Sequence, residues 1–104
     1  MQRKVLVVIT TEENNEVALK IGKFLIKKKL AACVSFKEIN SIYSWKGKLE
    51  HTKETEIIIK SKPQKLEFIL DILKKELTNE LPQLIYKAFE SEGSYHDWIT
   101  KSIV

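Results

Sequence analysis

The chain of 104 residues contains one cysteine, two prolines and three glycines, and it has no long apolar run. A single cysteine cannot form a disulfide within the chain, which fits a reducing compartment. No stretch of about 18 apolar residues is available to span a bilayer, and the apolar segment from Val5 to Ile9 is too short for the hydrophobic region of a signal peptide. We therefore expect a cytoplasmic protein without a membrane partner.

Chemical motifs are also scarce. The two histidines, His51 and His96, are far apart, and no His-x-x-x-His, Cys-x-x-Cys or carboxylate cluster has established metal-ligand spacing. No pair of nucleophile and base is evident, so we expect no enzymatic activity. The net charge of +4 is a mild excess, and its densest cluster, Lys27 to Lys29, suits the C-terminus of a helix. An anion or nucleic-acid patch is the alternative interpretation of that cluster.

The residues from Leu30 to Lys60 show the pattern of a long β-hairpin. Two runs rich in β-branched and aromatic residues flank Lys46-Gly47, and glycine readily takes the positive φ of a tight turn. About twelve residues on each arm would form a ribbon of roughly 40 Å, about twice the usual strand length. A small domain cannot cover such a ribbon, so the hairpin indicates partner subunits. We expect the pairs Trp45 with Lys48 and Tyr43 with Glu50, continuing toward Val34 and Ile59, with a bulge or break between Lys37 and Asn40.

The remaining patterns place helices and strands around this hairpin in one domain, residues 1–104. Lys4 to Thr10, with an uninterrupted apolar run inside it, is typical of a central strand buried on both faces, and Leu84 to Phe89 predicts a fourth strand. Helical spacing predicts a helix of about fifteen residues ending at Lys28 or Lys29, a stronger one over Leu66 to Leu77, and a short C-terminal helix containing Tyr95, Trp98 and Ile99.

The order β-α-β-β-α-β-α predicts an α+β fold of the ferredoxin-like, split β-α-β type with a short C-terminal helix. Right-handed crossovers place the first two helices on one face of the sheet. The other face stays open unless something covers it, and three open faces could cover one another around the axis of a trimer.

Several motifs, in their order and spacing, resemble the CutA family of divalent-ion tolerance proteins. They are Leu30-Ala31-Ala32-Cys33-Val34, Ser41-Ile42-Tyr43-Ser44-Trp45-Lys46-Gly47-Lys48-Leu49-Glu50, the segment Glu54 to Ser61, Leu81-Pro82, and Tyr95 with Trp98. The resemblance implies a homotrimer with a ferredoxin-like subunit and binding of divalent metals such as copper. In architecture such proteins look like nitrogen-regulatory signalling trimers.

The chain departs from the family pattern at places that concern metal binding. Some members carry Cys where this sequence has Thr10, and His-His where it has Glu76-Leu77. The resemblance implies that the positions of Glu76 and Leu77 are among those that bind copper in such members. Pro82-Gln83 replaces a common Pro-Glu pair, and Ser35 stands where Asn or Thr is usual. The resemblance therefore supports the family's fold and trimer for this chain more strongly than it supports copper ligation.

Four residues are candidate metal ligands. Cys33 offers a soft thiolate, although a cysteine in an apolar strand usually packs as a small hydrophobe. His51 lies beside Glu50 and near Glu54, so an imidazole–carboxylate site is conceivable, whereas a lone exposed histidine is the commoner case. We expect weak surface binding of a divalent ion such as copper through Glu50 and Glu54 with His51.

The hairpin also offers candidate contact residues. Tyr43 and Trp45 are amphipathic aromatics of the type that anchors subunit interfaces, with a ligand platform as the alternative. Glu56 and Lys60 flank three isoleucines and suit either solvated strand ends or a charged set in an intersubunit cleft that binds a small ligand.

Two other functions of this fold are weakly supported. RNA-recognition domains stack bases on aromatics of the two central strands, but Val5 to Ile9 and Ile57 to Ile59 contain none, so we expect no nucleic-acid partner. A phosphatase would need an arginine after the first strand, where this chain has Thr-Thr-Glu-Glu-Asn-Asn. The remaining alternative is a trimeric signalling or scaffold protein that binds a small effector between subunits.

Overall fold

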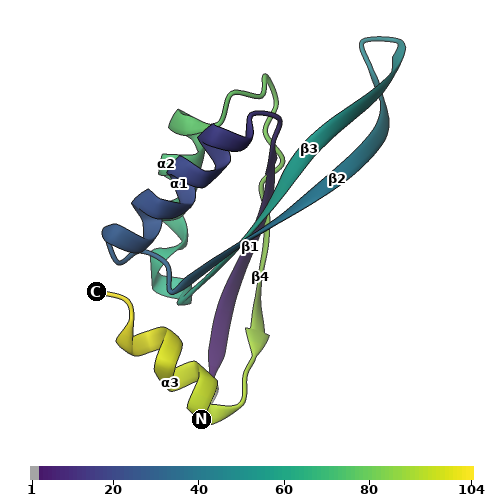
Figure 1. Ribbon diagram of the computed structural model, residues 1–104. Coiled ribbons are helices and arrows are strands. Elements are labelled where there is room, and N and C mark those ends of the chain that lie inside the picture. Colours follow the sequence, from purple (N-terminus) through teal and green to yellow (C-terminus); the bar gives the residue numbers. More distant parts are fainter. Residues whose placement is uncertain (1–2) are drawn as a thin grey trace.

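Two helices lie against one face of a four-stranded antiparallel sheet in the computed structural model, which describes residues 3–104 (Figure 1). In chain order the elements are β1 (Lys4–Glu12), α1 (Asn15–Lys27), β2 (Cys33–Trp45), β3 (Lys48–Ser61), the 3₁₀ turn η1 (Pro63–Lys65), α2 (Leu66–Glu76), β4 (Ile85–Glu90) and α3 (Gly93–Lys101). The strand order β2-β3-β1-β4 confirms the predicted α+β, ferredoxin-like arrangement.

The core forms where β1 and β3 meet the helices. Leu6 and Val8 alternate toward α1 and α2, and Ile57 and Ile59 of β3 do the same. We name this covered side the helix face of the sheet. Its buried partners on the helices include Ala18, Ile21, Leu25, Ile69 and Leu73. Full burial of one such aliphatic side chain contributes about 1.5–3 kcal/mol.

The opposite side, here named the open face, carries the alternate residues. Val5 packs there against Ile99 and Ile103, so α3 and the residues after it cover one end. On β4, Ile85 pairs with Ile9 and Phe89 pairs with Val5, and the two β4 side chains remain 54% and 48% exposed. Strand β1 is therefore buried on both faces near its start and again from Thr10 to Glu12, whereas Val7 and Ile9 between them are only partly covered on the open face.

Two residues, Glu13 and Asn14, separate helix α1 from β1, which ends two residues later than predicted. The Asn14 side chain accepts hydrogen bonds from the backbone N–H groups of Glu16 and Val17 at 2.9 and 3.2 Å, which caps the helix. The helix has 13 residues instead of the predicted fifteen or so. Within it, Gly22 allows close approach of β2, because an added Cβ would lie 2.6 Å from the Phe36 ring.

The hairpin pairs as the sequence predicted, from Cys33 opposite Lys60 to Trp45 opposite Lys48. Lys46 and Gly47 both have positive φ, 51° and 78°, as a type I′ turn requires. The expected bulge between Lys37 and Asn40 is wrong, since the ladder runs through it without interruption. The apolar alternation ends there because the strands leave the helix layer.

The ends of the other predicted elements shift by one or two residues. Strand β4 starts at Ile85 instead of Leu84, and α3 starts at Gly93, two residues before Tyr95, the first residue expected in it. The molecule measures 47 × 25 × 22 Å because the hairpin projects beyond the helices (Figure 1). No helix within residues 3–104 is long and apolar enough to cross a membrane.

Candidate functional site

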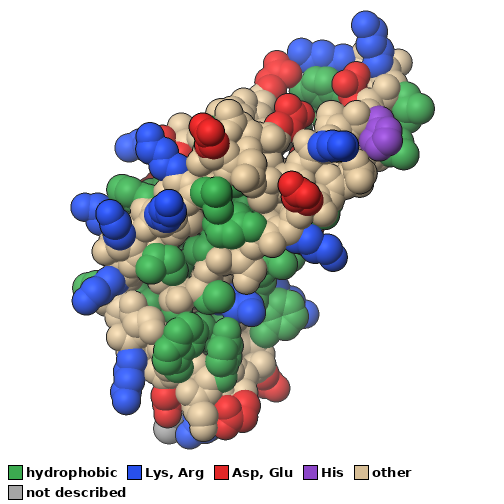
Figure 2. All heavy atoms as spheres, in the orientation of Figure 1, with side chains coloured by type: hydrophobic (Ala, Val, Ile, Leu, Met, Phe, Trp, Pro, Cys, Tyr) green, Lys and Arg blue, Asp and Glu red, His purple; other side chains and the backbone are tan. Residues whose placement is uncertain are grey.

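The projecting part of the hairpin presents two different surfaces. By alternation, Tyr43 and Trp45 share one surface with Glu50, which pairs with Tyr43 across the ladder. The other surface carries His51 opposite Ile42, and Leu49 next to the turn. Ile42 and Leu49 are 67% and 80% exposed, and hydrophobic side chains are visible at this end of the molecule (Figure 2). The hairpin is thus rich in apolar contact area that its own subunit does not use.

The structure does not gather the candidate metal ligands within one subunit. Glu50 and Glu54 lie on the same side of β3, whereas His51 points to the opposite side because neighbouring residues alternate. Cys33 pairs with Lys60 at the other end of the ladder, roughly 20 Å from Glu54 at 3.3 Å per residue. Across residues 3–104, no three His, Cys, Asp or Glu side chains come together in a way that could hold a metal ion.

Cys33 is half-buried on the open face of the sheet. Its Sγ lies 3.8 Å from the Ser35 hydroxyl, and the ladder partner of Cys33 is Lys60. The residue thus lies at the margin of the core instead of inside it. The ammonium group of Lys60 in turn lies 5.9 Å from the centre of the Tyr95 ring on α3.

Glu56 and Lys60 share the open face, as their separation along β3 requires. Glu56 pairs with Thr11 on one side and Lys37 on the other, and both Glu56 and Lys60 are half-buried. They therefore lie on the face of the sheet that α1 and α2 do not cover.

A polar hollow at the base of the hairpin was missed by sequence reasoning. It has a volume of about 370 Å³ and lies between the β1–α1 turn and the two hairpin strands. The Thr55 hydroxyl donates to Asn15 Oδ1 at 3.1 Å and ties the two parts together. The lining comprises Glu13, Asn15, Glu38, Ile39, Asn40, Lys53, Glu54 and Thr55. Only the ladder register, which aligns Glu38 with Thr55 and Asn40 with Lys53, would have indicated it.

Glu12, at the end of β1, is fully buried and joins two loops. Its Oε2 accepts the backbone N–H of Asn14 at 3.0 Å, while Oε1 accepts the backbone N–H of Thr78 at 2.9 Å. The hydroxyl of Thr78 also donates to Oε2. Asn79 adds a hydrogen bond of 3.2 Å from its side-chain amide to the carbonyl of Thr11. Buried polar atoms of this kind need such partners, so the group fixes the chain beside the hollow.

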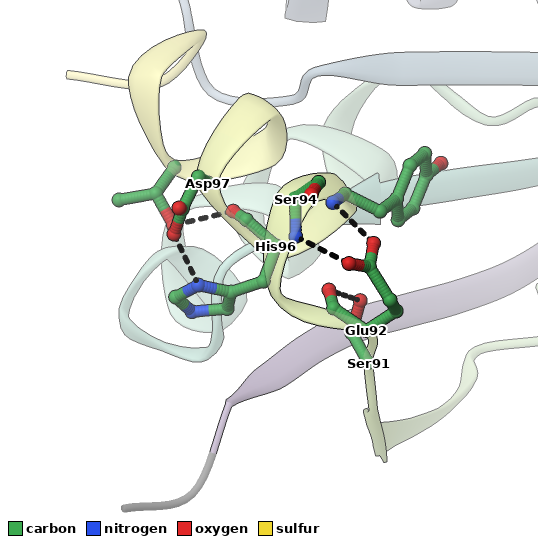
Figure 3. Close-up of polar contacts among 7 residues, drawn as sticks. Ser91, Glu92, Ser94, His96 and Asp97 are labelled. Atoms are coloured by element: carbon green, nitrogen blue, oxygen red, sulfur yellow. Dashed lines mark hydrogen bonds and ion pairs between the residues drawn. The ribbon is translucent and has the colours of Figure 1, made fainter.

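The remaining polar cluster belongs to the start of α3 (Figure 3). The Glu92 carboxylate accepts backbone N–H groups of Ser94 at 3.0 Å and Tyr95 at 3.1 Å. These hydrogen bonds, first that from Ser94, lower the pKa of Glu92 below its ordinary value. His96 lies nearby with Nδ1 3.3 Å from the Asp97 carboxylate. The arrangement caps a helix and gathers no ligand site.

A comparison with family models decides the relationship of this chain. Residues 6–102 match the model for CutA1 divalent ion tolerance protein. The chain belongs to the CutA1 family. A divalent-cation tolerance protein CutA from Thermotoga maritima is 33% identical over 100 residues, which cover 95% of this chain and 99% of the relative.

Solved CutA1 structures have the same fold. The crystal structure of CutA1 from Pyrococcus horikoshii matches with a TM-score of 0.90 at 27% identity, covering 95% of this chain and 98% of that one. The structure described as the periplasmic divalent cation tolerance protein CutA from Archaeoglobus fulgidus matches with a TM-score of 0.89 at 30% identity, covering 94% and 97%. These matches confirm both the resemblance and the fold class.

The CutA1-family positions that differ in this chain offer few ligands. Thr10 is fully buried, and its hydroxyl has no hydrogen-bond partner within residues 3–104. Leu77 is buried in the core, and Glu76 lies at the end of α2, where it lines a groove between the two helices. An aliphatic core side chain at position 77 cannot ligate a metal, so one of the two expected positions is lost outright.

Proposed function

We propose that this CutA1-family chain acts as a homotrimer that binds divalent cations and takes part in the response to metal ions such as copper. The observation that carries the trimer is the hairpin, which projects from the subunit with Ile42 and Leu49 largely exposed. Exposed apolar area of this kind marks interaction surfaces. Tyr43 and Trp45 are the proposed anchors against a neighbouring subunit.

The open face of the sheet supports the same proposal. Ile85 and Phe89 are about half exposed, and Ile58, Val7 and Ile9 are only partly covered. A continuous apolar strip on an antiparallel sheet is usually packed against something. Burial of three such faces against one another would remove this surface from water and would enclose Glu56 and Lys60 in an intersubunit cleft.

Cation binding is proposed to be weak and to occur on the hairpin surface. Glu50 and Glu54 supply oxygen ligands on one side, and His51 supplies a single imidazole on the other. Copper(II) prefers several nitrogen donors in a tetragonal arrangement, and copper(I) prefers thiolate, which here means the half-buried Cys33. The expected affinity is therefore weaker than micromolar. We propose no catalytic role and a cytoplasmic location.

The polar hollow favours a second function, the binding of a small effector by a trimeric signalling or scaffold protein. Its volume of about 370 Å³ lies within the usual range of small-molecule sites, which is about 300–1,000 Å³. Lys53 and the carboxylates of Glu13 and Glu38 provide charges of both signs there. This alternative shares the trimer with the main proposal and differs in the ligand.

Light scattering coupled to size-exclusion chromatography tests the assembly that both functions share. We expect about three times the subunit mass of 12.1 kDa at micromolar concentration. A stable species of one subunit mass would remove the basis of the trimer and of the intersubunit cleft. Titration with copper(II), described below, then separates cation binding from effector binding.

A further inference from the structure

The helix layer holds all of the chain's excess positive charge. Residues 14–29 and 63–77, which form α1, η1, α2 and their ends, contain eight lysines and four acidic residues. The rest of the chain contains ten basic and ten acidic residues, so its net charge is zero. The lysines are Lys20, Lys23, Lys27, Lys28, Lys29, Lys65, Lys74 and Lys75, and all but the half-buried Lys65 are exposed. Blue side chains accordingly gather over the helices (Figure 2).

Two exposed phenylalanines lie within this basic layer. Phe24 of α1 is 41% exposed and lines the groove between the helices, together with Val17 and Ile72. Phe68 of α2 is 57% exposed and lies one helical turn before Ile72, on the same side of α2. The outer surface of the layer therefore combines an apolar strip with surrounding lysines.

Lysine side chains lie directly against both rings. The ammonium group of Lys28 is 5.8 Å from the centre of the Phe24 ring, and that of Lys65 is 5.3 Å from the centre of the Phe68 ring. A lysine can keep its apolar stem on the ring while its charged end reaches toward phosphate groups. Aromatic side chains flanked by lysines in this way suit the boundary between lipid headgroups and acyl chains.

We propose that the outer surface of α1 and α2 binds peripherally to an anionic lipid bilayer, with Phe24 and Phe68 entering the interface and the lysines contacting lipid phosphates. The expectation of no membrane partner rested on the lack of a spanning segment, which does not bear on a surface that lies flat on a membrane. The proposal does not depend on metal binding. It uses the helix layer, whereas the proposed trimer would cover the open face on the opposite side of the sheet.

A partner helix fits this surface less well than a bilayer does. The groove between α1 and α2 has a volume of about 180 Å³, below the range of about 300–1,000 Å³ that is usual for pockets that enclose a ligand. Phe68, at 57% exposed, does not line that groove. A charged and apolar surface without a deep pocket suits a bilayer, because lipid headgroups and acyl chains can rearrange around the exposed rings and lysines.

Co-sedimentation with lipid vesicles tests the proposal. The intact protein is mixed with phosphatidylcholine vesicles that contain about one third phosphatidylglycerol, and separately with pure phosphatidylcholine vesicles. We expect binding to the anionic vesicles only, and a marked loss as salt is raised. The double variant Phe24→Ser/Phe68→Ser should bind at least about threefold more weakly, since it keeps the charge and loses the apolar contact.

Two variants with equal loss of charge locate the surface. The first variant is Lys23→Gln/Lys27→Gln/Lys74→Gln/Lys75→Gln. Each lysine near an anionic surface contributes up to roughly fivefold in vesicle affinity, so we expect this variant to bind at least tenfold more weakly. Lys46→Gln/Lys48→Gln/Lys53→Gln/Lys101→Gln removes four exposed lysines outside the layer, three on the hairpin and one on α3, and should bind nearly as the wild type. Circular dichroism and light scattering verify that each variant keeps its fold and assembly.

The outcomes that overturn the proposal are distinct. Absence of wild-type binding to anionic vesicles at low salt would refute it, as would equal binding to phosphatidylcholine alone. Equal losses in the two lysine variants would show that binding follows net charge and not this surface. Binding of an acidic amphipathic peptide in the absence of vesicle binding would assign the surface to a protein partner instead.

Discussion

Glu12 holds Thr78 through both of the hydrogen-bond donors of that residue, the backbone N–H at 2.9 Å and the hydroxyl. The contact joins the end of β1 to the loop that follows α2, across 66 positions of sequence. Because the same carboxylate also accepts the N–H of Asn14, both loops depend on one fully buried side chain.

The first prediction is that Glu12→Gln destabilises the protein by about 1–3 kcal/mol. The amide keeps the size of the side chain but replaces an acceptor oxygen by an NH₂ donor, which leaves at least one buried donor without a partner. Urea unfolding at a fixed protein concentration measures the effect. The neighbouring Glu13→Gln, at an exposed position, should change the free energy of unfolding by less than about 0.5 kcal/mol. Equal effects of the two changes would contradict a special role for Glu12.

The second prediction concerns the hairpin turn. Gly47 has a φ of 78°, and nothing lies within 4 Å of a Cβ added there, so Gly47→Ala acts through backbone strain alone. We expect a loss of about 1 kcal/mol in the free energy of unfolding. Lys46→Asn, at a φ of 51°, should be neutral or slightly stabilising because Asn-Gly is the preferred pair for this turn. A neutral Gly47→Ala would show that the turn relaxes in solution.

The sequence predicted the fold because its strongest patterns are local. Lys46-Gly47 predicted the hairpin register, and the apolar stripe of α2 predicted which side of that helix packs against the sheet. The alternation of apolar and polar residues was uninformative from Lys37 onward. The hairpin projects beyond the helices there, so no core requires one side of it to be apolar. The polar hollow was missed for another reason: Glu13 and Lys53 line the same hollow only because the tertiary structure brings the β1–α1 turn next to the hairpin. The role of Glu12 was equally hidden, since its partner Thr78 is remote in sequence.

The third prediction concerns assembly. If hairpins and open faces are buried between subunits, the midpoint of thermal unfolding should rise with protein concentration. Trp45→Ala should weaken assembly by about 3 kcal/mol or more, since truncation of a buried aromatic anchor removes contacts on both sides. Trp98→Ala on α3, at the other end of the molecule and 49% exposed, is the control. A midpoint that does not depend on concentration would indicate that the subunit folds alone.

The fourth prediction is a pH effect at the start of α3. The N–H groups of Ser94 and Tyr95 favour the ionised form of Glu92, so the pKa of Glu92 in the folded protein lies below its value in the unfolded chain. The cap therefore stabilises the helix above the unfolded value, and this stabilisation is lost as the pH falls through the folded value. The protection factors of the Ser94 and Tyr95 amides, which correct hydrogen exchange for its intrinsic slowing at lower pH, should decrease on acidification in the wild type. Glu92→Gln should remove that pH dependence, and a carboxyl signal of Glu92 that titrates at its ordinary value would contradict the argument.

The last prediction concerns copper(II). One imidazole, His51, and two carboxylates, Glu50 and Glu54, lie on opposite sides of one strand, so a subunit cannot surround an ion with them. Calorimetric titration should show affinity weaker than micromolar, with a further loss in His51→Ala. His96→Ala removes the other histidine, which lies on α3, and should change little. Tight binding at one site per subunit that is unaffected by His51→Ala would mean that other ligands hold the ion. Because copper(I) prefers thiolate, the next variant would then be Cys33→Ser under reducing conditions.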